Sequence, residues 1–499
     1  MKKVTTLVGV GLAIATLFVG MPVAASTSGP ARAPVATISW RPCHSLFGAQ
    51  CGFISVPLNY AHPNRKHIKI AVSRVRHTSS AGAYKGVILV NPGGPGAPGR
   101  SYATLGQDVP KHVGDDYDWI GFDPRGVGAS RPALRCVHDY FHVNRPDYRP
   151  RTSALLHKWK HRSRHYAQRC AAKHPALIRH MTTAETARDM DQIRLALGVD
   201  RISFYGFSYG TYLGQVYATL FPNHLRRMVL DSTVDPRRVW YGANLDQDIA
   251  FDRNITTWFK WVAKYHAHYH VGATEKAVEH RWYAILDQLA AHPAGGKVGP
   301  DEWTDTFLWA GYYRSTWKTL GHDFSRYVHG GHWRAVADFY AFYNSPGDDN
   351  GYAVYLAVEC TDAPWPQRWS RWQSDGDRVY AKAPFLTWDN AWFNAPCLYW
   401  KAPARKPVHI SGSSTQSVLL IDETHDAATP FEGSLEVRRR FLRSSLISEP
   451  GGGTHADSLS GDDCVDNRIA DYLRSGKRPA RKSGDRADYR CAPLPDPVP

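Results

Sequence analysis

Short apolar segments that alternate with helical patterns limit most strongly what this chain can fold into. Such segments lie at 85–90, 117–122, 201–205 and 227–230, and each is rich in aliphatic and aromatic residues. Helical patterns run from Thr182 to Leu197 and from Tyr212 to Thr219. Strands and helices in this order predict an α/β fold with right-handed crossovers and a mostly parallel sheet. Ligands bind such sheets beyond the carboxyl ends of the strands, and glycine-rich turns follow several strands here.

The middle of the chain differs in composition and predicts an inserted helical region. Residues 236–400 hold 14 of the 17 tryptophans, with helical patterns at 255–265 and 277–289. Strand patterns return at 406–410 and 417–421. We therefore expect a core formed by 40–235 and 401–499, the latter including a C-terminal tail, and a mainly helical cap at 236–400.

The first residues predict export. Lys2 and Lys3 precede an uncharged apolar stretch at 4–19, and Val23 and Ala25 supply the small residues of a cleavage site. The apolar stretch is shorter than the roughly 20 residues of a membrane span. We expect a signal peptide at 1–25, with a membrane anchor as the alternative, and then a loose terminus or short pro-segment at 26–39. The mature protein is expected to be extracellular.

Eight cysteines agree with an oxidising compartment, in which an even number predicts disulfides. We expect each cysteine to pair with its neighbour in the sequence, although the sequence alone leaves the pairing open. No CxxC pair occurs, which disfavours a zinc ribbon or a thioredoxin-type redox site. We expect no metal and no cofactor.

One motif supplies a candidate nucleophile. The sequence Gly-Phe-Ser-Tyr-Gly at 206–210 has the pattern G-x-S-x-G, between an expected strand that ends at Tyr205 and a helix that begins near Thr211. A sharp turn between strand and helix exposes the serine hydroxyl above the sheet. The context therefore favours Ser208 as a nucleophile over an ordinary glycine-rich turn.

A serine nucleophile needs a base and an acid, which follow it in the order Ser, Asp, His in this motif class. Asp426 comes shortly after the expected strand at 417–421, and His455 follows a run of three glycines. We expect Asp426 to be the acid and His455 the base. Asp422, Glu423 and His425 are nearby competitors.

Two backbone N–H groups must stabilise the oxyanion that forms during acyl transfer. Tyr209 follows the nucleophile and supplies one. The loop Asn-Pro-Gly-Gly-Pro-Gly at 91–96 is expected to supply the other from Gly93 or Gly94, because Pro95 has no N–H. This loop lacks the patterns of nucleotide-binding loops, so we expect no nucleotide.

Four motifs in register carry a resemblance to a known family. They lie at 91–96, 121–130, 206–211 and 426–430. The chain from about Trp40 onward resembles the secreted tripeptidyl aminopeptidases of actinomycete bacteria, within the proline-iminopeptidase family of α/β-hydrolase serine peptidases. The resemblance implies an α/β-hydrolase fold and an exopeptidase that releases short peptides, with tripeptides as the expected product, from free N-termini. It places the triad on Ser208, Asp426 and His455 and an oxyanion donor on Gly94.

The chain departs from the wider family at one position. Relatives often have His-Gly-Gly-Pro-Gly in the first motif, and this chain has Pro92 where they have the histidine. The departure removes any role for that histidine and leaves the glycine N–H groups.

An aminopeptidase must also recognise a cationic α-amino group, which requires a carboxylate. The candidates in the expected cap are Glu302, Asp305, Glu359 and Asp362, each of which is otherwise a solvated or helix-capping acid. Glu359 and Asp362 lead because they flank Cys360, whose disulfide would hold them in place.

Two other functions fit parts of the sequence. An esterase or lipase would use the same triad, although the expected cap mixes histidine, arginine and aspartate with its aromatic residues. The net charge of +16 also suggests a non-enzymatic protein that binds polyanions in a cell envelope. Residues 136–180 contribute +8 and residues 474–499 contribute +4, apart from every catalytic motif. We expect peptide substrates, no nucleic acid, no stable membrane association and at most weak contact with an anionic cell wall.

Overall fold

The computed structural model describes residues 37–415 and 417–499. The predicted signal peptide and its cleavage site lie outside the described residues. The strands are β1 Arg41–Pro42, β2 Gln50–Pro57, β3 His67–Val75, β4 Gly86–Asn91, β5 Tyr117–Asp123, β6 Ile202–Phe207, β7 Leu225–Asp231, β8 Val418–Glu423, β9 Ser444–Glu449 and β10 Tyr489–Arg490. The helices are α1 Ser153–Lys173, α2 Thr183–Ala196, α3 Tyr209–Leu220, α4 Tyr241–Lys264, α5 His266–Tyr269, α6 Glu275–Ala291, α7 Pro300–Tyr312, α8 Trp317–Gly330, α9 Trp333–Asn344, α10 Asn350–Asp362, α11 Trp369–Tyr380, α12 Thr387–Asn394, α13 Glu432–Arg440 and α14 Asp463–Ser475.

The described strands form a single sheet in the order β1-β2-β3-β5-β4-β6-β7-β8-β9-β10. Strands β1, β2, β3 and β5 pair antiparallel in that order, and every pair from β5–β4 to β9–β10 is parallel. In register, Val90 of β4 lies beside Tyr205 of β6, and Leu230 of β7 lies beside Leu420 of β8. The prediction of a mostly parallel α/β sheet is confirmed.

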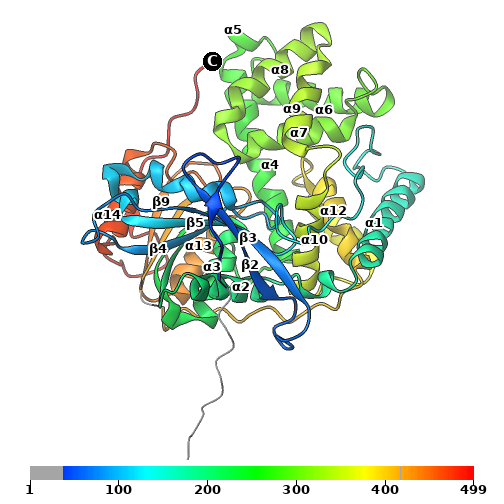
Figure 1. Cartoon of the computed structure of the whole chain (residues 1–499). Coiled ribbons are helices and arrows are strands. Elements are labelled where there is room, and N and C mark those ends of the chain that lie inside the picture. Colours follow the sequence, from blue (N-terminus) through cyan, green and yellow to red (C-terminus); the bar gives the residue numbers. More distant parts are fainter. Residues whose placement is uncertain (1–36, 416) are drawn as a thin grey trace, which may run out of the picture. The chain divides into compact units, whose positions relative to one another are not determined.

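Alternate residues of the central strands build two cores, one on each face of the sheet. Leu89 and Phe204 belong to the core that also holds apolar residues of α2 and α3. Val90 and Tyr205 belong to the opposite core, with residues of α14. Figure 1 shows α2 and α3 below the strands and the helices α4 to α9 above them. The near-continuous apolar strands follow from this burial on both faces.

The helices α4 to α12 come between β7 and β8 in the chain. Helices α4, α6, α7, α8 and α9 share an apolar core rich in aromatic residues. We call the helices α4 to α12 the cap. A segment of the first expected core part also contacts it, because Trp159 of α1 stacks on Trp392 of α12 with ring centroids 5.7 Å apart. The cap surface therefore includes α1, which the sequence division at residue 236 does not indicate.

The prediction of a strand at 406–410 is wrong. The structure has irregular backbone there, and the sheet resumes only with β8. Pro407 within this segment has no N–H to donate to a neighbouring strand, and Arg405 and Lys406 are exposed. The β-branched residues of the segment produced the strand pattern without a sheet edge to pair with.

The four disulfides join neighbouring cysteines, as predicted: Cys43–Cys51, Cys136–Cys170, Cys360–Cys397 and Cys464–Cys491. Each closes a local loop of the chain. Within residues 37–415 and 417–499, none of the helices combines the length and apolarity that crossing a membrane requires.

Candidate active site

Ser208 lies at the sharp turn that the motif predicts. Strand β6 ends at Phe207 and helix α3 begins at Tyr209, so the serine alone connects them. Its backbone angles, φ 55° and ψ −127°, are rarely adopted by residues other than glycine. They mark a strained position of the kind found at functional sites. The serine N–H donates to the carbonyl oxygen of Asp231 at the end of β7, at 3.0 Å. This bond fixes the turn above the carboxyl end of the sheet.

The two glycines of the motif are required by close backbone contacts. A Cβ on Gly206 would lie 2.5 Å from the carbonyl oxygen of Gly210. A Cβ on Gly210 would lie 2.5 Å from the carbonyl oxygen of Asn91, the last residue of β4. Side chains at either position would therefore open the turn or separate it from the end of β4.

Asp426 and His455 form the contact expected of an acid and a base. His455 Nδ1 lies 2.8 Å from Asp426 Oδ2. The N–H groups of Ala428 and Thr429 donate to Asp426 Oδ1 at 2.8 and 3.0 Å, so the local turn orients the carboxylate. Burial acts to raise the pKa of Asp426, but His455 and the hydrogen bonds outweigh it and lower that pKa. The carboxylate of Asp426 therefore stays ionised. Burial alone would lower the pKa of His455, but the charge of Asp426 raises that pKa above its usual value.

The loop that carries His455 is attached to the same strand end as the serine turn. The N–H of Ala456 donates to Oγ of Ser232 at 2.7 Å, and Ser232 directly follows β7. The N–H of His455 donates to the carbonyl oxygen of Tyr312 in α7 at 2.9 Å. The loops that carry the candidate nucleophile and base are thus both held at the end of β7, beside the cap.

The competitors for the acid position have other partners. Asp422 accepts a hydrogen bond from the Ser434 hydroxyl at 2.5 Å. Glu423 accepts the N–H of Thr454, the residue before His455. Of these acids only Asp426 contacts the imidazole of His455, which supports the position predicted for it; its role in catalysis stays a prediction.

The two candidate oxyanion donors border one cavity. Gly94 and Tyr209 line it together with Ser208. Tyr209 is the first residue of α3, where backbone N–H groups lack helical partners and the helix dipole favours negative charge. The position is suited to stabilise an oxyanion next to the serine hydroxyl.

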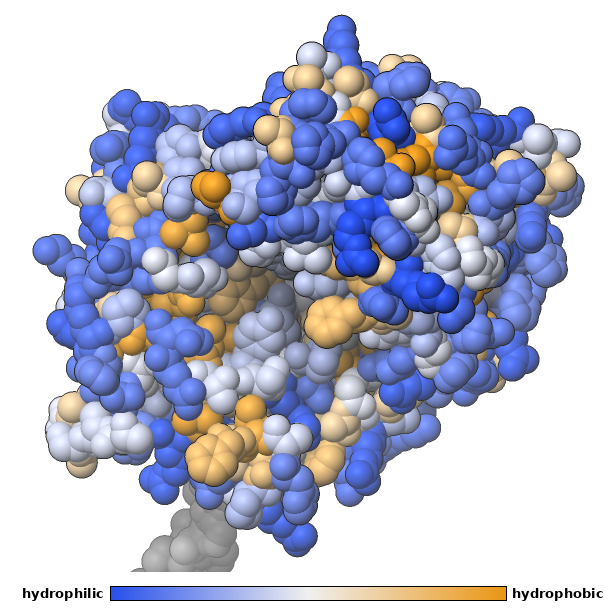
Figure 2. Space-filling view, turned by 90° about the horizontal axis from the view of Figure 1, so that it is seen from above, coloured by the Kyte–Doolittle hydropathy of each residue, from blue (hydrophilic) through white to orange (hydrophobic). Residues whose placement is uncertain are grey.

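The cavity has a volume of about 600 Å³ and lies between the sheet edge and the cap. Its lining includes apolar side chains such as Trp240, Phe251 and Leu308 as well as several acids and arginines. Figure 2 shows one face of the molecule hollowed, with apolar side chains gathered round the hollow. A mixed cavity of this size can enclose the end of a peptide.

Glu359 is the one of the four candidate acids that lines the cavity. Its Oε2 atom is buried and has no hydrogen-bond partner among the described residues. Burial raises the pKa of Glu359 to about 8, against the opposing effect of the polar groups of Tyr355 and Asn244. An unpaired buried carboxyl group is costly, and a cation that entered the cavity would ionise and satisfy it.

The other three acids are bound elsewhere. Both oxygens of Asp362 accept from Thr183, through the N–H at 2.8 Å and the hydroxyl at 2.5 Å. The Thr183 hydroxyl in turn contacts the Tyr209 hydroxyl at 2.7 Å, so Asp362 supports the residue that follows the nucleophile.

Glu302 and Asp305 form a buried ion-pair group with Arg145. Asp305 Oδ2 lies 2.7 Å from the Arg145 guanidinium and Glu302 Oε1 lies 3.4 Å from it. Glu359 is therefore the acid of the set that lines the cavity and has no ion-pair partner among the described residues.

Comparisons with known proteins identify the family to which this chain belongs. Residues 86–291 match the family model described as alpha/beta hydrolase fold, and residues 383–486 match the model described as TAP-like protein. The tripeptidyl aminopeptidase of Streptomyces lividans is 41% identical over 94% of this chain and 89% of that protein. This chain belongs to the tripeptidyl aminopeptidase family of α/β-hydrolases.

Other members of the family are more distant and have different names. The serine protease Hip1 of Mycobacterium tuberculosis is 30% identical over 89% of each chain. Carboxylesterase B of the same species is 31% identical over 91% of this chain and 90% of that protein. Membership of this peptidase family makes the chain a serine hydrolase of peptidase type and leaves the non-enzymatic alternative without support.

The sequence of this chain did not indicate every residue of the cavity. Asp389 of α12 also lines it and is buried, and burial together with Asp305 raises its pKa well above the usual range. Tyr312 lines the cavity and stands edge-on to His455, with ring centroids 5.7 Å apart. Neither residue belongs to a motif, and only the folding of the cap brings them to the site.

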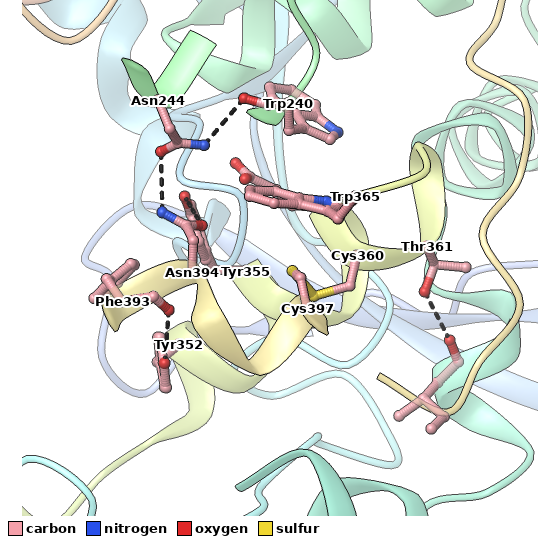
Figure 3. Close-up of a disulfide and its surroundings, with 12 residues drawn as sticks. Trp240, Asn244, Tyr352, Tyr355, Cys360, Thr361, Trp365, Phe393, Asn394 and Cys397 are labelled. Atoms are coloured by element: carbon pink, nitrogen blue, oxygen red, sulfur yellow. Dashed lines mark hydrogen bonds between the residues drawn. A yellow bond between two sulfur atoms is a disulfide. The ribbon is translucent and has the colours of Figure 1, made fainter. Parts of the chain in front are cut away.

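The disulfide between Cys360 and Cys397 holds the Glu359 region in place. It joins α10 to the short helix Ala395–Tyr399 that follows α12 (Figure 3). Beside it, the Tyr355 hydroxyl donates to Asn394 Oδ1 at 2.9 Å, and Asn394 Nδ2 donates to Asn244 Oδ1 at 3.1 Å. The disulfide and this chain of hydrogen bonds connect α10, α12 and α4 around Glu359.

Replacing Cys360 and Cys397 together by serine is expected to affect both stability and substrate binding. The cysteines are 37 residues apart, and loss of a cross-link over such a loop costs about 4 kcal/mol in the chain-entropy model. We also expect a several-fold rise in KM for peptides with a free N-terminus, because α10 loses its attachment. Thermal unfolding and steady-state kinetics measure the two effects.

Replacing Cys43 and Cys51 by serine is the matched control. These residues are 8 apart and lie at the start of the sheet, so a smaller loss of about 2.5 kcal/mol is expected without a change in KM. An unchanged KM in the variant of Cys360 and Cys397 would contradict a positioning role for that disulfide.

Proposed function

We propose that this protein is a secreted serine exopeptidase that releases short peptides, mainly tripeptides, from free N-termini. The observation that carries the proposal is one cavity lined by both Ser208 and the buried carboxyl group of Glu359, whose Oε2 atom has no hydrogen-bond partner among the described residues. A nucleophile and a buried acid in one cavity match a substrate whose α-ammonium is bound a short distance from the scissile bond. The name of the two Streptomyces relatives, tripeptidyl aminopeptidase, supports a released length of three residues.

The proposed reaction is acyl transfer through an ester on the serine. Ser208 Oγ attacks the scissile carbonyl carbon while His455 accepts the hydroxyl proton, and Asp426 stabilises the imidazolium. The oxyanion accepts hydrogen bonds from the N–H groups of Tyr209 and Gly94. When the C–N bond breaks, His455 returns the proton to the leaving amine. A water molecule, deprotonated by the same imidazole, then hydrolyses the acyl-enzyme.

The role of Glu359 gives the exopeptidase preference. The carboxyl group is held at a fixed place in the cavity, so a substrate ammonium bound to it sets how many residues reach the serine. A blocked N-terminus has no charge to pair with the carboxylate. Peptides with a free N-terminus should therefore react faster than their acetylated forms.

The variant Glu359→Gln tests this role. We expect kcat/KM for a peptide with a free N-terminus to fall about 100-fold, since loss of one partner of a buried charge pair costs about 2–5 kcal/mol. The acetylated peptide should be cleaved at the same slow rate by both enzymes. The ratio of the two kcat/KM values is the measurement.

Asp362→Asn is the matched control for that experiment. Because Asp362 contacts Thr183 and not the cavity, its variant should change both substrates by the same factor. An unchanged preference for free N-termini in Glu359→Gln would assign amine recognition to another group.

Export from the cell is part of the proposal. The N-terminal pattern of the sequence and four disulfides support it, because such bonds persist in oxidising compartments. The detection of mature protein in culture medium, with an N-terminus after Ala25, is the direct test.

A second candidate function is ester hydrolysis, which the relative named carboxylesterase B favours. The same triad would act on an acyl ester. Hydrolysis of a tripeptidyl anilide and of a short acyl ester by the same enzyme separates the two. The peptidase proposal expects a higher kcat/KM for the anilide, and a large preference for the ester would refute it.

A further inference from the structure

A long segment of the chain carries only positive charge. Between Tyr148 and Ala184 there are nine lysine and arginine residues and no aspartate or glutamate. Helix α1 forms the centre of this segment, and Figure 1 shows it at the outer side of the cap, beside α12. None of the lysines and arginines of α1 forms an ion pair with a described acid.

Helix α1 has one buried face and one charged face. Trp159, Tyr166 and Cys170 are buried and attach the helix to the rest of the molecule. Lys158 and Arg169 are exposed on the other side, about 16 Å apart along the axis at 1.5 Å per residue. With Trp159 and Tyr166 covered, the exposed side of the helix is mainly polar and cationic.

A second acid-free segment extends this surface. No acid occurs between Asn390 and Ile421, and Lys401, Arg405 and Lys406 are exposed. The two segments are neighbours, because the guanidinium of Arg164 in α1 lies over the ring of Tyr399, 5.0 Å from its centroid. Positive charge from two distant parts of the sequence thus gathers on one surface.

The two segments also meet near the C-terminal side of α1. The N–H of Arg405 donates to the carbonyl oxygen of Thr361 at 2.7 Å, and the Thr361 hydroxyl donates to the carbonyl oxygen of Ile178 at 3.4 Å. Exposed Arg179 follows Ile178 directly. We call the exposed basic residues of 157–179 and 401–406 the basic surface.

We propose that the basic surface binds a linear phosphate polymer without bases, of the glycerol-phosphate type, and holds the enzyme on an anionic layer. Repeated phosphates complement unpaired lysine and arginine side chains along an extended surface. None of the basic residues of this surface lines the cavity, so substrate access stays open while the polymer is bound.

Two other anionic partners fit the surface less well. Membrane-surface helices insert large exposed apolar side chains among the lipids, whereas the exposed apolar residues of α1 are alanines only and its two leucines, at 155–156, are half-buried. Single-stranded nucleic acid requires aromatic rings on which bases stack. The large rings nearest to α1 already have a cation over one face, since Lys160 lies over Trp369 and Arg164 lies over Tyr399. A polymer recognised through its phosphates alone is the partner that remains.

The test compares two variants that lose the same charge. The first replaces Lys158, Arg169, Lys401 and Lys406 by glutamine. The second, the control, replaces the exposed tail residues Lys477, Lys482, Arg486 and Arg490 by glutamine. The probe is poly(glycerol phosphate) of defined length, and calorimetric titration at 50 and 200 mM salt gives the affinity.

We expect the affinity of the unchanged enzyme to fall about 50-fold between the two salt concentrations, as for four phosphate contacts. The first variant should bind at least ten-fold more weakly at 50 mM salt and lose most of that salt dependence. The control should stay within three-fold of the unchanged enzyme. Hydrolysis of a tripeptidyl anilide should be the same for all three proteins and insensitive to salt.

Several results would overturn the proposal. Equal binding by the two variants would show that net charge alone matters and that the basic surface has no special role. Binding to single-stranded DNA of equal phosphate number, or to phosphatidylglycerol vesicles, that is more than ten-fold tighter than binding to the polymer would show that the partner is a different one.

Discussion

Replacing Ser208 by alanine is expected to reduce kcat for peptide hydrolysis about 10⁶-fold, to a level near the detection limit. The change removes the atom that attacks the scissile carbonyl carbon, and the loss of a triad serine in another serine peptidase has an effect of this size. The fold should persist, because the turn is held by the backbone bond from Ser208 N–H to Asp231 and by close backbone contacts. Stopped and steady-state assays with a tripeptidyl anilide measure the loss.

The variant should still bind substrate, because the cavity and Glu359 are unchanged. A tripeptide with a free N-terminus should therefore bind Ser208→Ala and the unchanged enzyme with similar affinity. Thermal unfolding serves as the control for folding. Peptide hydrolysis at the original rate would refute the assignment of the nucleophile.

Replacing Asp426 by asparagine is expected to lower kcat about 10⁴-fold with little change in KM. In the unchanged enzyme, His455 Nδ1 lies 2.8 Å from a carboxylate oxygen of Asp426. This contact keeps a proton on Nδ1 and leaves Nε2 free to accept one. An amide at this place can present N–H instead and stabilise the wrong tautomer, and it removes the charge that stabilises the imidazolium. Steady-state kinetics from pH 6 to pH 9 measure the effect.

Asp422→Asn is the matched control, since Asp422 lies in the same segment and is also buried. It contacts Ser434 and not the imidazole, so its variant should keep kcat within about ten-fold of the original. A larger loss for Asp422→Asn than for Asp426→Asn would exchange the two roles.

The core of the fold could be predicted because its information is local. The strands at 86–91, 117–123, 202–207 and 225–231 are buried on both faces, which requires near-continuous apolar runs. The turn at Ser208 could be predicted because only glycine fits beside it at 206 and 210. The segment at 406–410 misled because β-branched residues favour strands only where a partner strand is available.

The acid and base could be located from their order in the chain and from the turns around them. Asp426 starts a turn whose N–H groups bind its own carboxylate, a local pattern that the sequence carries. The choice among the cap acids could not be made in this way. Glu359 and Asp362 are three residues apart on one helix, and only the position of α10 decides that Glu359 reaches the cavity while Asp362 meets Thr183.

The contribution of α1 to the cap surface was also hidden from the sequence. Trp159 lies more than 200 residues before its stacking partner Trp392, and no pattern in either segment refers to the other. Long-range packing of this kind depends on the topology of the whole chain. The same holds for the basic surface, whose two segments are adjacent only in the folded protein.

The measurement that tests the central claim most directly is a time course of cleavage products by mass spectrometry. The substrates are a ten-residue peptide with a free N-terminus and the same peptide with an acetylated N-terminus. The account predicts that the free peptide loses its first three residues as one intact tripeptide, and then the next three, while the acetylated peptide stays largely intact. Internal cleavage of both peptides at the same site and at equal rates would contradict it.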